Sequence, residues 1–297
     1  MDAMNDDILE KYLQAGKIAF KAKMYGKELI KEGELTYNVA EKIEEFIMNN
    51  SGRIAFPVNL SINEEAAHYT PSYNDKRTFA KGDLVKLDLG VHIEGYIADT
   101  ALTVEVGTNK CQSLINASKE ALSNAIKLVN EGEIRLSAIG EKIENTIKKW
   151  GYKPISNLTG HGLDNYSLHA NLSIWNIKTT TMEKLYYNHA YAIEPFATNG
   201  IGYVENGISG NIFQFNKKIS NKSDAVVKEL YEMYGKLPFA MRWIEKKYGN
   251  EAVKKIMPYI KPYPILIEKK GSTVAQTEET IVLYNNQLYV TSNGSNL

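Results

Sequence analysis

Two aspartates interrupt the most strand-like part of this sequence. Asp88 and Asp99 lie in the apolar segments 84–90 and 96–104, where aspartate is rare because strands favour β-branched and aromatic residues. If the two segments form a hairpin with a two-residue turn near 93–95, a separation of eleven puts both carboxylates on one face. Like charges so close repel unless a cation lies between them, so the pair indicates either a shared metal or two unrelated acids. The other face would be the core side, through Val85, Leu87, Leu89, Leu102 and Val104.

Two further carboxylates and a histidine have an equally unusual setting. Glu194 ends an apolar stretch and is held extended by the proline that follows it, and Glu278 lies in another buried-looking strand. Unpaired buried carboxylates are costly, so four of them favour a shared cation. His161 lies between two glycines, which let the backbone approach a ligand closely, although a single histidine is more often a core residue. Oxygen ligands with one imidazole suit manganese, iron, cobalt or zinc at a pair of sites.

The periodicity of apolar residues predicts an α+β fold. Helical spacing recurs in two pairs of segments, 8–29 with 39–47 and 114–129 with 139–150. Strand-like segments follow each pair, at 54–62 and 84–104 and then at 155–158, 190–198 and 265–284. The repeated order suggests two similar halves with a shared sheet, and the length of the chain fits one large domain or two modest ones. A separate helical patch at 217–262 is interpreted as an insertion into the second half.

Composition narrows the range of functions. The chain has 35 basic and 35 acidic residues, so it has no net charge that would attract nucleic acid. Only four of the basic residues are arginines and 31 are lysines, whereas recognition of phosphates and bases favours the planar guanidinium of arginine. The single cysteine, Cys111, excludes an internal disulfide and a thiolate metal cage. The N-terminal residues are acidic, and no apolar run reaches the roughly 18 residues of a membrane helix. We expect a cytoplasmic protein without nucleic-acid or membrane partners, and a monomer by default.

Several short motifs are specific in combination. They are Phe56-Pro57-Val58-Asn59, His68-Tyr69-Thr70-Pro71, Lys86-Leu87-Asp88-Leu89-Gly90, Gly95-Tyr96-Ile97-Ala98-Asp99-Thr100, Thr159-Gly160-His161-Gly162 and Ala192-Ile193-Glu194-Pro195-Phe196. Together they resemble type 2 methionine aminopeptidases of the archaeal kind, which are pita-bread metallopeptidases. The resemblance spans about residues 8–290. It also covers the patch at 217–262, which is similar to the segment that separates type 2 from type 1 enzymes.

This resemblance implies the pita-bread fold, with two similar halves around a curved sheet in a single catalytic domain over residues 1–297. It also implies a dinuclear metal site. Asp88 and Asp99 would hold the first ion and His161 and Glu194 the second, with Asp99 and Glu278 bridging the two. Four carboxylates would balance two divalent cations, which could be cobalt, manganese, iron(II) or zinc. A hydroxide bridging them would be held at neutral pH and would attack the carbonyl after the N-terminal methionine. Glu194 would then act as the proton shuttle.

The resemblance also implies a substrate site. His169 would stabilise the developing oxyanion, and His68 would contact the scissile amide or the leaving group. The methionine slot would be lined by Phe56, Leu168 and Tyr263, with Asn211 near its mouth, although core packing explains Phe56 and Leu168 equally well. A tight space beyond the scissile bond would admit only small second residues.

Those implications define the expected substrates and partners. They are N-terminal Met-peptides of nascent proteins, and a transient association with ribosomes is compatible with this role. Because Met1 is followed by the bulky, charged Asp2, the protein is predicted to keep its own methionine.

The sequence departs from the family beside Glu278. An aromatic residue usually precedes this glutamate and a histidine comes after it, whereas here the neighbours are Thr277 and Glu279. The extra acid would either disturb the local charge balance or face solvent, because side chains alternate along a strand.

Three alternatives to this function stay open at this point. A prolidase or aminopeptidase P would share the five ligands, but those relatives resemble longer chains with an extra N-terminal domain. An inactive relative that serves as an RNA or protein scaffold should have lost ligands and gained basic patches. A purely structural metal protein would unfold without metal and show no peptide turnover.

Overall fold

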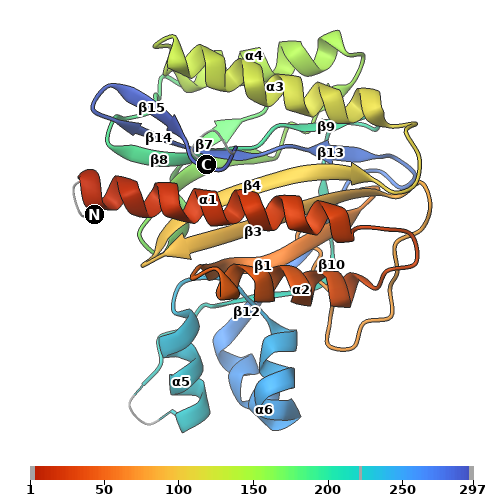
Figure 1. Ribbon diagram of the computed structural model, residues 1–297, viewed down its shortest axis with the longest axis vertical. Coiled ribbons are helices and arrows are strands. Elements are labelled where there is room, and N and C mark those ends of the chain that lie inside the picture. The colour runs from red at the N-terminus through yellow and green to blue at the C-terminus, as the bar shows by residue number, and fades with distance from the viewer. Residues whose placement is uncertain (1–3, 221–222, 294–297) are drawn as a thin grey trace.

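The computed structural model describes residues 4–220 and 223–293 and shows the expected α+β fold (Figure 1). Its helices are α1 (Asp6–Leu29), α2 (Thr36–Asn49), α3 (Gln112–Asn130), α4 (Leu136–Lys149), α5 (Ala225–Tyr234) and α6 (Met241–Ile256), followed by the 3-10 turn η1 (Met257–Tyr259). Its strands are β1 (Arg53–Ile62), β2 (Glu65–Ala67), β3 (Leu84–Ile93), β4 (Tyr96–Glu105), β5 (Lys153–Pro154), β6 (Thr159–Asp164), β7 (Ser167–Trp175), β8 (His189–Ile193), β9 (Phe196–Thr198), β10 (Glu205–Phe215), β11 (Phe239–Ala240), β12 (Ile260–Ile267), β13 (Val274–Gln276), β14 (Glu279–Tyr284) and β15 (Gln287–Val290). Among these residues, none of the helices has the length and apolar character needed to span a bilayer. The retention of Met1 lies outside the described residues.

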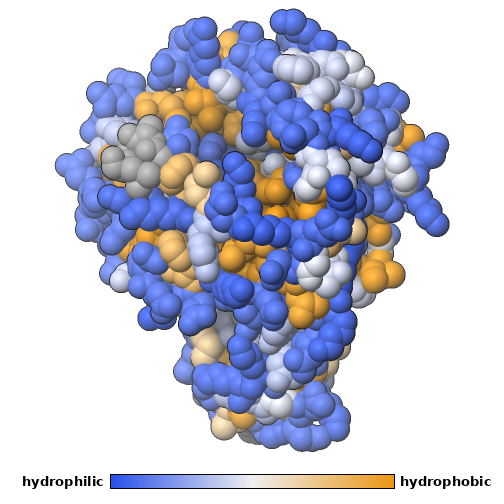
Figure 2. All heavy atoms as spheres, turned by 45° about the vertical axis from the view of Figure 1, so that its right-hand side comes forward, coloured by the Kyte–Doolittle hydropathy of each residue, from blue (hydrophilic) through white to orange (hydrophobic). Residues whose placement is uncertain are grey.

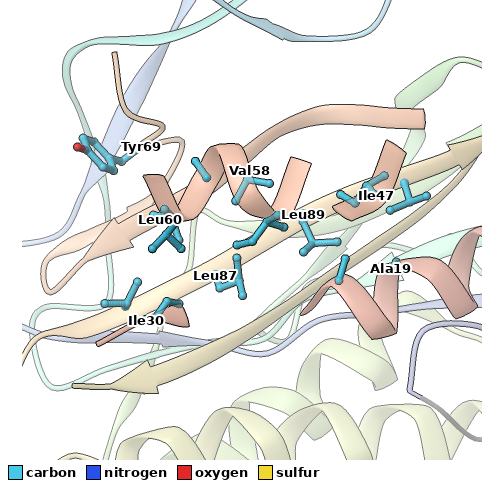
Figure 3. Packing of buried hydrophobic residues seen from close by; sticks show 14 of the residues in the cluster. Ala19, Ile30, Ile47, Val58, Leu60, Tyr69, Leu87 and Leu89 are labelled. Carbon is cyan, nitrogen blue, oxygen red and sulfur yellow. The ribbon is translucent and has the colours of Figure 1, made fainter. Parts of the chain in front are cut away.

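The two predicted helix pairs cover the strands from outside. In Figure 1, α1 and α2 lie over β1, β3 and β4, while α3 and α4 lie together at the top of the molecule, above α1. Figure 3 shows Ala19 of α1 and Ile47 of α2 facing Leu87 and Leu89 of β3. These side chains are almost fully buried, and each buried leucine contributes about 1.5–3 kcal/mol relative to an exposed one. The apolar face of each helix therefore holds the layer of helices against the outer, convex surface of the sheet.

The hairpin of β3 and β4 has the predicted register. Ile93 pairs with Tyr96 across a two-residue turn, in which Glu94 and Gly95 have φ values of 50° and 90°. Such values are typical of a type I′ turn, which places glycine second. Asp88 then lies opposite Ala101, and Gly90 lies opposite Asp99. Both carboxylates consequently share one face of the hairpin, and the opposite face joins the main core.

The expected shared sheet is divided into separately paired parts. Their strand orders are β1-β3-β4, β11-β10-β12-β2, β13-β9-β5 and β15-β14-β8-β6-β7. The predicted strand at 155–158 is wrong, because β5 pairs with β9 in one sheet and β6 pairs with β7 and β8 in another. The chain needs residues 155–158 as the connection between them. The segment 190–198 is likewise two strands, which are broken at Glu194 and Pro195.

The helical patch extends away from the sheets and has its own small core. Helices α5 and α6 point downward together in Figure 1, packed around Leu230, Phe239 and Ile244. Its link to the body is Arg242, whose side chain is fully buried. The guanidinium pairs with the buried Glu44 of α2, and its Nη1 donates to Thr70 Oγ1 at 2.6 Å. This contact fixes the patch against the segment that carries His68.

Removing that link should destabilise the fold. Replacement of Arg242 by methionine leaves the buried Glu44 carboxylate without its cation, with only Trp243 Nε1 and the Val58 N–H donating to it. Breaking a buried ion pair in this way costs about 3–5 kcal/mol. The expected loss can be measured as the free energy of unfolding in urea. The control is Lys246→Met, because Lys246 is exposed and pairs with Glu41, and exposed pairs contribute only about 0–1 kcal/mol. Equal stability of the two variants would show that Arg242 does not anchor the patch.

Candidate metal centre

The four predicted carboxylates and His161 meet at one cavity. Asp88 comes from β3, Asp99 from β4 and His161 from β6, while Glu194 follows β8 and Glu278 precedes β14. All five line the same pocket, although up to 190 positions separate them in the sequence. Two separately paired sheets, β1-β3-β4 and β15-β14-β8-β6-β7, therefore contribute to one site.

Breaks in the strands give the two glutamates their positions. Glu278 forms an isolated bridge with Ala101 of β4, in which the Glu278 N–H donates to the Ala101 carbonyl at 3.0 Å. The bridge sets Glu278 beside the strand that carries Asp99. Glu194 is followed by Pro195, which lacks an N–H and ends the ladder of β8. Both acids thus lie where backbone pairing changes from one sheet to another.

His161 is oriented as a ligand toward these acids. Its Nε2 lies 3.6 Å from Asp99 Oδ2 and 3.7 Å from Glu194 Oε1, too far for good hydrogen bonds. Its Nδ1 lies 3.3 Å from the Gly162 carbonyl, so the proton belongs on Nδ1 and the Nε2 lone pair faces the acids. Ligand atoms of Asp99, His161 and Glu278 all lie within 4.8 Å of one another. This spacing suits one cation between them.

The electrostatics of the cluster demand positive charge. Burial raises the pKa of Asp88 to about 7. Burial, together with neighbouring carboxylates, raises the pKa values of Asp99, Glu194 and Glu278 well above their ordinary range. Burial lowers the pKa of His161 to about 3, helped by the nearby His169, so this imidazole is neutral and can donate a lone pair. The group is therefore matched to a bound cation rather than to a protonated histidine.

Unsatisfied polar atoms support the same conclusion. Among the described residues, Asp88 Oδ1, Asp99 Oδ1 and Glu278 Oε1 are buried without a hydrogen-bond partner. Native proteins rarely leave such atoms unpaired, because each costs about 1–3 kcal/mol. Carboxylate oxygens and one imidazole nitrogen are donors that fit divalent first-row metals. The residues present consequently fit a metal centre.

Gln276 belongs to this cluster and was not predicted. It is fully buried, and its Nε2 lies 3.4 Å from Asp88 Oδ2 and 3.3 Å from both Glu194 Oε2 and Glu278 Oε2. The amide thus contacts three of the four acids. The signal in the sequence was its position two residues before Glu278, because residues i and i+2 of a strand share a face.

His68 and His169 lie beside the acids without contacting them closely. His68 Nδ1 lies 3.2 Å from the Pro264 carbonyl, which leaves Nε2 free, and burial lowers the pKa of His68 to about 4. Its φ of 69° is unusual for a residue other than glycine and is typical of strain at functional sites. The centre of the His169 ring lies 4.5 Å from the centre of the His161 ring. Desolvation by the surrounding protein lowers the pKa of His169, although part of this residue is exposed to solvent.

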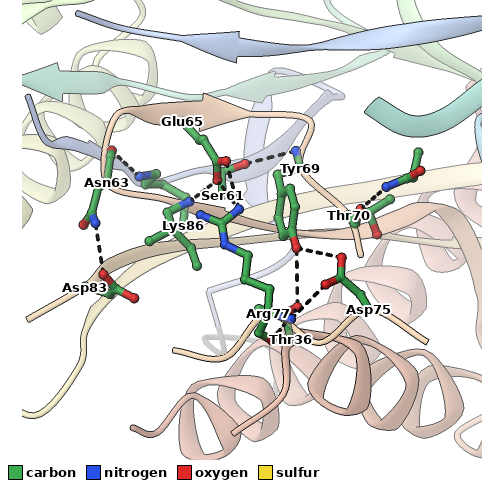
Figure 4. Close-up of polar contacts among 12 residues, drawn as sticks. Thr36, Ser61, Asn63, Glu65, Tyr69, Thr70, Asp75, Arg77, Asp83 and Lys86 are labelled. Atoms are coloured by element: carbon green, nitrogen blue, oxygen red, sulfur yellow. Dashed lines mark hydrogen bonds and ion pairs between the residues drawn. The ribbon is translucent and has the colours of Figure 1, made fainter. Parts of the chain in front are cut away.

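Polar contacts hold the chain on both sides of His68. Arg77 Nη1 lies 2.9 Å from Glu65 Oε1, and the Tyr69 hydroxyl donates to Asp75 Oδ2 at 3.2 Å (Figure 4). Figure 4 also shows Lys86 reaching toward Asn63. The Lys86 Nζ donates a hydrogen bond to the Asn63 carbonyl oxygen at 2.7 Å. The strained backbone of His68 is thus fixed by its neighbours rather than by a regular strand.

An apolar wall faces the acids across the cavity. Phe56, Leu168 and Tyr263 line it, together with Ile212 and Pro238 from the second half of the chain. The cavity holds about 60 Å³, which is room for a few water-sized groups. Asn211 lies beside the cavity rather than on its wall, and its Nδ2 donates to the Thr70 carbonyl at 3.2 Å.

The two unusual neighbours of Glu278 point away from the metal site. Thr277 Oγ1 lies 2.9 Å from Ser118 Oγ of α3, and Glu279 Oε1 lies 2.8 Å from Lys23 Nζ of α1. The Glu279 side chain is only 12% exposed, and α1 supplies the buried lysine that pairs with it. The expectation that this acid faces solvent is therefore wrong.

Comparison with known proteins agrees with this geometry. The model of metallopeptidase family M24 matches residues 10–233. A methionine aminopeptidase from Archaeoglobus fulgidus is 42% identical over 299 residues, which cover 97% of this chain and 100% of that protein. A solved methionine aminopeptidase from Thermotoga maritima has a TM-score of 0.71 at 22% identity, covering 98% of this chain and 99% of that one. A prolidase from Pyrococcus furiosus has a TM-score of 0.63 at 20% identity, covering 99% of this chain but 66% of that longer one. This chain has the pita-bread fold and belongs to the methionine aminopeptidases of metallopeptidase family M24.

Proposed function

We propose that this methionine aminopeptidase is of type 2 and removes the initiator methionine from proteins whose second residue is small. The observation that carries the proposal is the buried cluster of four carboxylates and one neutral histidine, which faces an apolar wall. Acids of this kind need cations, and the adjoining wall suits an unbranched apolar side chain.

Five residues would hold two divalent cations. Asp88 and Asp99 would bind the first and His161 and Glu194 the second, with Asp99 and Glu278 shared by both. Two such ions, whether cobalt, manganese, iron(II) or zinc, would act as Lewis acids that make water nucleophilic at neutral pH. Gln276 would orient the carboxylates through its amide, since it lies near three of them.

The remaining polar groups would handle the peptide and its protons. Glu194, which lines the cavity beside the other acids, would accept a proton from the attacking water and return it to the leaving amine. His169 would donate to the developing oxyanion. His68, with its Nδ1 held by Pro264 and its Nε2 free, would contact the scissile amide or the leaving group.

The methionine side chain would occupy the apolar part of the cavity. Phe56, Leu168 and Tyr263 would contact this side chain. Asn211 would lie near the mouth of the cavity, where its hydrogen bond to the Thr70 carbonyl would position the neighbouring backbone. A tight space beyond the scissile bond would restrict the size of the second residue of the substrate. This restriction is the basis for the preference for small second residues.

The helical patch supports the type 2 assignment. We infer that residues 217–262 form an insertion within a single catalytic domain, because α5 and α6 share their own core while Pro238 lines the site. The protein would act as a cytoplasmic monomer that meets nascent chains, with transient ribosome association as one route to them. An inactive scaffold is the less favoured alternative, because all five ligand residues are retained at one cavity.

Peptide turnover tests this proposal directly. Metal-stripped protein should release methionine from Met-Gly-Gly after manganese, cobalt or iron(II) is restored, and much more slowly from Met-Leu-Gly. Glu194→Gln should lower the rate by about 10²–10⁴-fold, because it removes a proton carrier and a ligand charge. Glu205→Gln, at an exposed glutamate of β10, should keep normal turnover. No release with any of these metals would reject the peptidase and favour the scaffold.

Metal binding should stabilise the protein more at pH 8 than at pH 6. The pKa of Asp88 is raised to about 7, and those of the other three acids are also raised, so without metal the folded state retains protons that the unfolded state has lost. Its stability should therefore fall from pH 6 to pH 8, while fewer protons compete with the metal.

Thermal unfolding with EDTA or with manganese at the two pH values measures this difference. Asp88→Asn removes one ligand and should reduce the manganese-induced rise in Tm. An equal or smaller manganese effect at pH 8 would contradict the assignment of the cluster.

A further inference from the structure

A second and larger cavity lies on the other side of the metal-bearing strands. It holds about 450 Å³ and is bounded by α1, α3, β4 and the chain around Thr277 and Glu279. This volume is within the range of small-molecule sites, about 300–1,000 Å³. We name this cavity the helix groove. Because Thr277 and Glu279 alternate with Glu278 along the chain, the groove and the metal site occupy opposite faces of one strand.

The groove combines apolar walls with unbalanced positive charge. Phe20 and Met24 of α1 face Leu122 and Ile126 of α3 across Leu102 of β4. In Figure 2, hydrophobic atoms lie recessed between hydrophilic ones across the middle of the molecule. Such walls can bury the apolar part of a small molecule, while the charged residues at the rim select the polar end of the same molecule.

The charges of the groove leave two cations without a partner. Lys23, Lys27, Lys119 and Glu279 are its charged lining residues. Lys23 is bound to Glu279 at 2.8 Å, and the other Glu279 oxygen accepts from Ser292 Oγ at 2.5 Å, so this acid is already satisfied. In the part of the chain that the structure describes, neither Lys27 nor Lys119 forms an ion pair with a carboxylate. Burial and the nearby Lys27 both lower the pKa of Lys119, as expected for two facing cations.

We propose that the helix groove binds a small organic anion, a carboxylate with an aliphatic tail, whose charge lies between Lys27 and Lys119 and whose tail lies between α1 and α3. The charge pattern rejects a cation, and the apolar walls disfavour an inorganic ion. The site does not use the metals or the peptide cavity, so its existence is independent of the proposed peptidase function.

Octanoate is the probe that tests the site. Isothermal titration calorimetry of the full chain should show one saturable site, with weaker binding at high salt. The double variant Lys27→Glu, Lys119→Glu should weaken octanoate binding about tenfold, because two charge contacts become repulsive. Ser123→Trp, at an exposed position on the rim, should fill the groove and block binding.

The control is Lys127→Glu, which reverses one lysine charge on α3 outside the groove and is compared with Lys119→Glu alone as well as with the double variant. Lys127 is 73% exposed, and its variant should bind octanoate as the wild type does. Equal binding by the Lys27→Glu, Lys119→Glu variant, or the absence of saturation in the wild type, would overturn the proposal. Binding of a glutamate-rich peptide without binding of octanoate would also overturn it in favour of a protein partner. None of these results depends on peptide turnover, so failure here leaves the peptidase proposal intact.

Discussion

Mutual repulsion among four buried carboxylates is the constraint on which this structure depends. Asp88, Asp99, Glu194 and Glu278 converge from separate sheets, and the pKa of each is raised by burial. Among the described residues, the direct ion pairs of these acids involve only the neutral His161, and Lys23 acts on Glu278 without pairing with it. A fold that keeps them together must be stabilised elsewhere, by the helices on its convex side, and the proposed cations would offset the repulsion within the site.

The strand segment 276–279 shows how one short sequence serves two environments. Gln276 and Glu278 face the metal site, while Thr277 and Glu279 face the helices. The alternation separates a negative cluster from a neutralised pair by the thickness of one strand. Lys23 is the residue that makes this possible, because it brings a buried ammonium to Glu279 from α1.

Local rules predicted much of the site. The register of β3 and β4 followed from the odd sum of opposed positions, and with it the shared face of Asp88 and Asp99. The four helices followed from apolar spacing. Gln276 could have been included by the same alternation that placed Glu278.

Long-range contacts could not be predicted in this way. Lys23 and Glu279 are 256 positions apart, and Arg242 meets Glu44 across 198 positions. Pairings of this kind depend on how elements pack rather than on local pattern. The division of the sheet also depends on such packing, as does the connection at 155–158 that separates β5 from β6. The family resemblance supplied the order of the five proposed ligands, whereas only the structure showed how closely they converge and which way burial shifts their pKa values.

The most direct test of this account is a crystal structure of manganese-loaded protein with anomalous diffraction data collected on both sides of the manganese absorption edge. The account predicts two anomalous peaks in the cavity, with Asp99 and Glu278 between them, His161 Nε2 at one and Asp88 at the other. A single peak, or peaks away from these five side chains, would contradict the proposed dinuclear centre.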